Sequence, residues 1–132
     1  MKIAATHHVA VCTPNFTKLC DFYENVLGLP RVGRFAGKNI IFVQAGDTVI
    51  EIVERLEPMD APRRQGWAHF AFEVDDIAAA HAELVGLGVV FHIEPKLFPE
   101  DSPAVKLAFF KDPDGNELEL VEPLTIRYPQ AK

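Results

Sequence analysis

The sequence lacks the long apolar runs and the cysteine framework that mark membrane and disulfide-rich proteins. No stretch approaches the roughly 18 consecutive apolar residues of a transmembrane helix. The first residues, MKIAATHHVAV, have no basic region followed by a long apolar segment, so they predict no signal peptide and a cytoplasmic location. The two cysteines, Cys12 and Cys20, are too few to form a disulfide framework, and we expect both to be small buried residues.

Runs of lysine or arginine are also missing. The chain has 13 Lys and Arg against 19 Asp and Glu, for a formal net charge of −6. A surface of this sign does not attract nucleic acid or an anionic membrane, and we expect neither as a partner. The 132 residues are 48% hydrophobic and 24% charged, which predicts a single domain over 1–132 with a real core.

An internal duplication organises this domain. Module one covers about 3–56 and module two about 67–123, with a linker at about 57–66 that is rich in proline and charge. Each module predicts the order βαβββ: an alternating strand with a histidine, an amphipathic helix, and strands of which the last carries a glutamate. The predicted fold is therefore α+β, with two tandem βαβββ modules.

Turn and capping residues set the expected bounds of the elements. HHVAV (7–11) predicts a strand, and 13–28 predicts a helix capped by Thr13 or Asn15 and stopped at Gly28. In the second module WAHFAFEV (67–74) predicts the strand. The helix at 75–88 would begin at Asp75 or Asp76 and end near Gly86 and Gly88. Further strands are predicted in RVGRFAG, NIIFVQA, TVIEIVE, VVFHIE, VKLAFF and NELELVE. The segment PKLFPEDSP (95–103), with three prolines, predicts an irregular loop that could cap a pocket.

Four polar residues share one geometric feature. Strand side chains alternate between faces, and in every case the bulkier apolar neighbours point away from the polar residue. This is expected if helices cover the outer face of each sheet and the curved mixed sheets surround a cavity. The four residues are His8, Glu51, His69 and Glu119.

Burying a carboxylate in an apolar strand costs several kcal/mol unless it is paired or bound to a cation. Two carboxylates and two imidazoles, one of each per module, could satisfy one another around a single divalent ion. Their oxygen and nitrogen donors suit Ni, Zn, Mn, Co or Fe, among which the sequence does not choose. Taken singly, a histidine or glutamate on a strand is usually structural; the repeated placement favours a metal site.

The paired βαβββ plan with HHVAV, FYENVLGL, VIEIVE, AHFAFEVDDI and FFKDPDGNELELVE resembles the vicinal oxygen chelate superfamily, and the small bacterial glyoxalase I-like proteins in particular. The resemblance covers nearly the whole chain. It implies that His8, Glu51, His69 and Glu119 are metal ligands. It also implies a homodimer in which each site joins one subunit's first module to the other's second module.

The same resemblance implies a metal-dependent lyase or isomerase like lactoylglutathione lyase, which stabilises an enediolate on the metal. Its partner would be a small-molecule substrate, with thiol adducts among the candidates. Glu119 is our first choice for the base that removes the carbon-bound proton, and Glu51 the second. Two positions depart from the bacterial pattern: Cys12 stands where an Arg is expected and Arg55 where an Asn is expected. Both departures put glutathione recognition in doubt.

Three alternatives stay open. An epimerase of the methylmalonyl-CoA type uses the same enolate chemistry but generally has Gln in place of Glu51. An Fe(II) extradiol-type dioxygenase needs only His8, His69 and Glu119 and is usually twice as long. A drug-binding protein of the bleomycin-resistance type keeps the fold and loses the ligands, all of which are present here.

The remaining histidines and the aromatic residues are predicted to have structural roles or none that the sequence identifies. His7 is predicted on the helix-facing side with Val9, and His81 is expected on the surface of the second helix or partly packed there, while no partner can be named for His92. Four aromatic residues are either core or cavity lining, with core the commoner role: Trp67, Phe42, Phe109 and Phe110.

Overall fold

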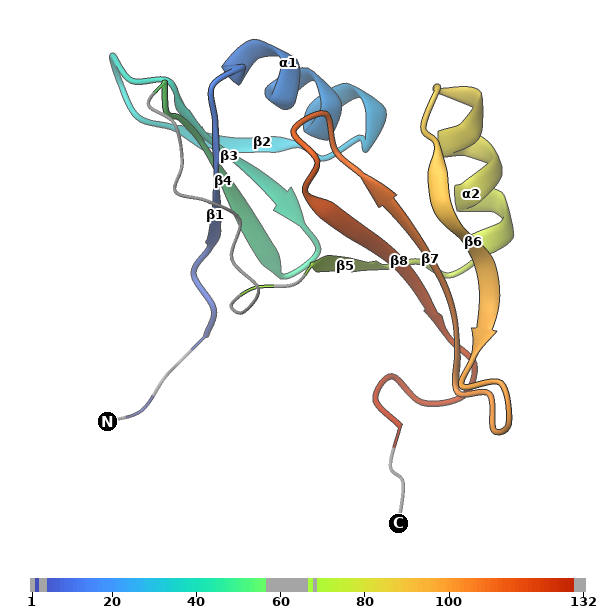
Figure 1. Cartoon of the computed structure of the whole chain (residues 1–132). Helices are drawn as coiled ribbons and strands as arrows, with labels where there is room; N and C mark the ends of the chain where they lie inside the picture. The colour runs from blue at the N-terminus through green and yellow to red at the C-terminus, as the bar shows by residue number, and fades with distance from the viewer. Residues whose placement is uncertain (1, 3–4, 57–66, 68, 130–132) are drawn as a thin grey trace. The chain divides into compact units, whose positions relative to one another are not determined.

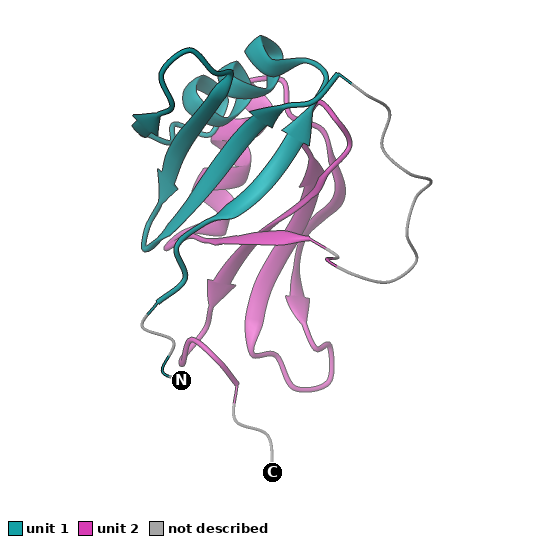
Figure 2. Cartoon of the chain, turned by 90° about the vertical axis from the view of Figure 1, so that its left-hand side faces the viewer, with its two compact units in different colours: residues 1–63 teal, residues 64–132 magenta. Residues whose placement is uncertain are grey.

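The structure is a computed structural model that describes residues 2, 5–56, 67 and 69–129. The chain divides into two compact units, residues 1–63 and 64–132 (Figure 2). Each unit contains a four-stranded sheet and helical structure, so the predicted α+β fold is confirmed (Figure 1). Within the described residues, no helix is long and apolar enough to cross a membrane.

Unit one follows the predicted order of a strand, helical structure and three more strands. Its sheet has the order β1-β4-β3-β2, with β1 parallel to β4 and the other pairs antiparallel. A parallel pair needs a crossover between its strands, and the helical segment lies in that connection. The elements are β1 (Val9–Thr13), α1 (Phe16–Asp21), the π-helix η1 (Phe22–Val26), β2 (Arg31–Arg34), β3 (Ile40–Ala45) and β4 (Thr48–Glu54).

Unit two repeats this topology. Its sheet has the order β5-β8-β7-β6, again with one parallel pair, β5 with β8, and two antiparallel pairs. The Asp76 side chain accepts a hydrogen bond from the backbone N–H of Ala79 and so caps α2, as predicted. The elements are β5 (Phe70–Glu73), α2 (Ile77–Gly86), β6 (Phe91–Phe98), β7 (Val105–Lys111) and β8 (Glu117–Pro123).

Alternation along β4 and β8 separates a core face from a second face in each unit. Ile50 and Ile52 are at most 2% exposed, and Leu118 and Leu120 at most 4%. In each unit the helix contacts this strand and lies over one side of the sheet (Figure 1), so the buried side chains are assigned to the helix-covered side. The glutamates between them therefore point to the opposite face.

Several predicted bounds were wrong. Both histidine-bearing strands begin one residue after the predicted ligand, so His8 and His69 precede β1 and β5. The first helix begins after Asn15, which is one of its two predicted caps; Thr13 lies in β1, and the helix changes to a π-helix at Phe22. The predicted linker at 57–66 lies outside the described residues.

The loop predicted at 95–103 is also shorter than expected, because β6 continues to Phe98. Pro95 is compatible with a strand here because β6 is at the edge of its sheet, where one side needs no partner. The β6–β7 register shifts between Ile93 and Lys96, on either side of this proline. Pro95 therefore coincides with an irregularity in β6 and does not end the strand.

Candidate metal centre

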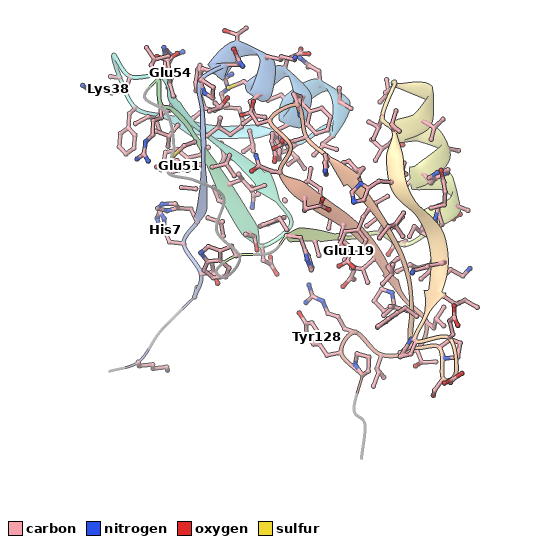
Figure 3. The ribbon with its side chains drawn as sticks, in the orientation of Figure 1. His7, Lys38, Glu51, Glu54, Glu119 and Tyr128 are labelled. Carbon is pink, nitrogen blue, oxygen red and sulfur yellow. The ribbon has the colours of Figure 1, made fainter. Side chains whose placement is uncertain are left out.

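In unit one, His8 and Glu51 come together from sequence positions 43 residues apart. The parallel register places Ala10 opposite Glu51, so His8 lies two residues before the paired position. His8 Nε2 is 4.0 Å from Glu51 Oε1, with side chains 36% and 16% exposed. Glu51 points away from the helical side of its sheet (Figure 3).

Unit two brings His69 and Glu119 together in the same way. Here Ala71 lies opposite Glu119, and His69 again precedes the paired residue by two positions. His69 Nε2 is 3.7 Å from Glu119 Oε1, and the side chains are 40% and 13% exposed. Each unit thus presents one imidazole and one mostly buried carboxylate in the same local arrangement, with Glu119 labelled in Figure 3.

An aromatic ring accompanies each pair. Phe42 is paired with Glu51 in the β3–β4 register, and its ring meets His8 edge-to-face with centroids 5.9 Å apart. Phe109 is paired with Glu119 across β7 and β8, and its ring meets His69 with centroids 5.3 Å apart. The repeated unit is therefore a trio of His, Glu and Phe, which packing holds in place.

These contacts divide the four aromatic residues discussed above. Phe42 and Phe109 lie on the sheet face that carries the glutamate, whereas Phe110 is fully buried in the core and Trp67 is fully exposed. The sequence holds a signal for this placement, because once strand register is assumed a phenylalanine stands opposite each glutamate. The register itself is set by pairing of the folded strands.

Burial changes the acid strength of one of the two glutamates. It raises the pKa of the Glu119 carboxyl above its ordinary value, while the nearby His69 opposes this by lowering the same pKa. Burial is the larger of the two effects. A carboxylate held this way gains from a cation that replaces its lost hydration.

The donor set fits a divalent ion, although neither unit completes a site. Donors at about 2.0–2.2 Å from one ion lie roughly 3–4 Å apart, close to the separations seen in both pairs. Within the part of the chain that the structure describes, no group of three or more His, Cys, Asp or Glu side chains could hold a metal ion. Two donors from each unit are thus available, and a typical site needs three or four.

The remaining histidines lie elsewhere. His7 is exposed and precedes β1, so its predicted helix-facing position was wrong; its Nδ1 lies 2.8 Å from Nδ1 of His8. His81, on α2, is half-buried, with Nε2 2.6 Å from Glu94 Oε2. The partner of His92, which could not be named from the sequence, is Glu117: His92 Nε2 lies 2.9 Å from Glu117 Oε2.

Of the two departures from the bacterial glyoxalase pattern, one lies in β1 and the other directly after the neighbouring strand β4. Cys12 is half-buried in β1 and is paired with Val53 of β4. Arg55 is exposed, directly after β4, and its backbone N–H donates to the carbonyl of Thr13. Cys12 cannot supply the positive charge that an arginine offers to an anionic substrate.

This fold, two βαβββ units each with a His and a Glu on one sheet face, is that of a glyoxalase-like protein. The family model described as Glyoxalase/Bleomycin resistance protein/Dioxygenase superfamily matches residues 5–120. The chain therefore belongs to this superfamily, as its motifs predicted. Members of the superfamily usually bind a divalent metal.

Individual relatives carry different names. The chain is 32% identical over 128 residues to the uncharacterized protein YaeR of Escherichia coli, covering 88% of this chain and 94% of YaeR. It is 29% identical over 126 residues to lactoylglutathione lyase of Neisseria meningitidis, covering 87% of this chain and 88% of the lyase.

A mitochondrial methylmalonyl-CoA epimerase of Mus musculus is 32% identical over 96 residues, or 63% of this chain and 53% of the epimerase. Among solved structures, that of SMU.1112c superimposes with a TM-score of 0.76 and 32% identity, over 92% of this chain and all of the other. The similarity thus extends over nearly the whole length of some relatives but does not single out one activity.

Proposed function

We propose that the protein is a metal-dependent lyase or isomerase of the glyoxalase I type, with His8, Glu51, His69 and Glu119 as ligands of one divalent ion per site. One observation carries the proposal: the relation of histidine to glutamate is the same in both units. In each unit the glutamate pairs with an alanine of the first strand, and the histidine lies two residues before that alanine. A structural role for either pair alone would not require this repetition.

Glu119 is the proposed base. It is the more buried of the two glutamates, and burial raises the pKa of its carboxyl, which makes it a stronger proton acceptor than an ordinary glutamate. A divalent ion, when bound, would stabilise the negative charge that develops on the vicinal substrate oxygens. Glu119 would take the carbon-bound proton and return it to the neighbouring carbon, and Glu51 is the second candidate for this role.

The proposed substrate is a small carbonyl compound, with thiol adducts as the first class to test. Similarity to the lactoylglutathione lyase of Neisseria meningitidis supports this class. The cysteine at position 12 argues against the glutathione contacts of that enzyme type. We therefore propose the reaction type and leave the thiol partner to the assay.

The ligands of one site would come from two copies of the chain. We propose a homodimer in which His8 and Glu51 of one copy bind the same ion as His69 and Glu119 of the other. Support comes from the number of metal donors. Among the described residues, each unit brings one His and one Glu together and has no group of three donors. A second copy would raise the number of donors to the four of a closed metal site.

A complementation experiment tests this proposal. One variant combines His8→Ala with Glu51→Ala and the other combines His69→Ala with Glu119→Ala. Each alone should bind no stoichiometric metal. After joint refolding, random pairing gives about half heterodimers, each with one complete site, so about a quarter of the wild-type metal should return. Metal bound by either variant alone contradicts the four-ligand site, and a mixture without recovery contradicts its assembly from two copies.

Activity is tested on the metal-loaded wild type with the hemithioacetals of methylglyoxal and several thiols. Conversion to the thioester supports the lyase. The second candidate is an epimerase, favoured by the similarity to the mouse methylmalonyl-CoA epimerase. Exchange of the α-proton of methylmalonyl-CoA with deuterated solvent, without thioester formation from any hemithioacetal, would replace the first proposal by the second.

A further inference from the structure

His7 stands next to a proposed ligand and contacts it. Its Nδ1 lies 2.8 Å from Nδ1 of His8, and the two rings meet edge-to-face with centroids 5.1 Å apart and 77° between their planes. The other ring nitrogen of His8, Nε2, is the one near Glu51, at 4.0 Å. The two nitrogens of His8 thus have different neighbours.

This arrangement assigns a role to each nitrogen. A neutral imidazole has one N–H donor and one lone-pair acceptor, and the hydrogen bond of one nitrogen determines which nitrogen is left for a metal. A bond at Nδ1 leaves the Nε2 lone pair of His8 directed toward the side where Glu51 lies. Partners of this kind fix the orientation of a metal-bound imidazole and raise its basicity.

We propose that His7 is a positioning residue that holds His8 for metal binding by accepting a hydrogen bond from its Nδ1–H. This inference rests on the proposed function, because it takes His8 as a ligand. With Nε2 of His8 on the ion, the proton of His8 is on Nδ1, and His7 must offer its own Nδ1 lone pair. His7 then carries its proton on Nε2.

The second half of the chain has no such residue in its sequence. Ala68 precedes His69, and an alanine side chain cannot accept a hydrogen bond. His7 therefore lies outside the set of residues that the duplication repeats. At this position the two halves of the sequence differ in whether the residue before the histidine has a side chain that can accept a hydrogen bond.

Two near-isosteric substitutions separate the hydrogen bond from other roles of His7. The Oδ1 atom of His7→Asn occupies the place of Nδ1, so this variant keeps an acceptor for His8. In His7→Gln the polar atoms lie one bond further out, near the place of Nε2. His7→Ala removes both, and His81→Ala, on α2, is the control for loss of a histidine away from the ligands.

The first readout is the Kd for Zn²⁺, measured by competition with a chromogenic chelator. His7→Ala and His7→Gln should weaken binding on the order of tenfold or more, the usual effect of losing a ligand's partner. His7→Asn and His81→Ala should stay within about threefold of the wild type. Equal weakening in His7→Asn and His7→Ala would overturn the hydrogen-bond role, as would wild-type affinity in His7→Gln.

The second readout is the nitrogen-15 spectrum of the histidine rings in the zinc-loaded protein. His8 should carry its proton on Nδ1 and His7 on Nε2, and the His8 Nδ1 proton should exchange slowly in the wild type and in His7→Asn only. A His7 proton on Nδ1 would overturn the inference while leaving the metal site intact. Failure of the wild type to bind zinc would instead refute the proposed function, and this inference with it.

Discussion

The ring of Phe109 packs edge-to-face against the imidazole of His69, with centroids 5.3 Å apart and 88° between the planes. Phe109 is also the residue paired with Glu119 in the sheet. One aromatic side chain therefore touches one proposed ligand and lies beside the other. Phe42 has the same relation to His8 and Glu51.

Removing this ring should weaken metal binding without removing a donor. Edge-to-face aromatic pairs contribute about 0.5–1.5 kcal/mol, so we expect Phe109→Leu to raise the Kd for Zn²⁺ about two- to tenfold. Phe72→Leu is the matched control, because Phe72 lies on β5 with its ring against Phe70. Titration calorimetry on both variants makes the comparison, and an equal change in the two would show that the effect is one of general stability.

The two glutamates should differ in their effect on turnover. If Glu119 is the base, Glu119→Gln should lower kcat by about a hundredfold or more, the usual share of a positioned proton acceptor. Glu51→Gln should weaken metal binding but leave a larger kcat once metal is saturating. The measurement is kcat at saturating metal for both variants on an active substrate. A larger loss in Glu51→Gln would exchange the two roles.

Glu119 should destabilise the metal-free protein at neutral pH. Burial raises the pKa of its carboxyl in the folded state, so folding favours the protonated form. The stability that this proton supplies is present below the unfolded-state pKa and is lost as pH rises through the folded-state pKa. Glu119→Gln, which stays uncharged, should therefore gain Tm relative to wild type as pH rises.

Thermal unfolding in the presence of a chelator, from pH 4 to pH 8, measures this difference. Glu100→Gln, in an exposed loop, is the control and should track the wild type throughout. A constant difference between Glu119→Gln and wild type across the range would contradict the linkage. Added zinc should reverse the order of stability at pH 8, because the variant loses a ligand.

The two thiols should react at different rates. Cys20 is only 5% exposed, and burial, followed by the charge of Glu24, raises the pKa of its thiol. The thiolate is the reactive form, so alkylation of Cys20 should be slow in the folded protein. Mass spectrometry after iodoacetamide treatment should show modification at Cys12 first, with both sites modified in denaturant. Faster reaction at Cys20 than at Cys12 would show that helix α1 opens readily.

Much of the fold follows from local pattern. Alternation in TVIEIVE and NELELVE correctly separated the buried leucines and isoleucines from the glutamates, because neighbouring side chains of a strand must point to opposite faces. The cap at Asp76 was likewise predictable, since it depends on residues within one turn. These signals are local, and the duplication supplied an independent copy of each.

Contacts between distant strands were decided only by the tertiary structure. The sequence by itself determined which residues alternate and which types are available to bind a metal: one histidine and one glutamate in each half. It did not determine that Ala10 lies opposite Glu51, that Phe42 and Phe109 touch the histidines, or that β6 continues past Pro95 at a sheet edge. It also placed His7 within the first strand and facing the helix, whereas His7 is exposed, precedes β1 and contacts His8. Register and partner choice come from pairing across many residues, where small differences in packing select one arrangement among several that the local pattern allows.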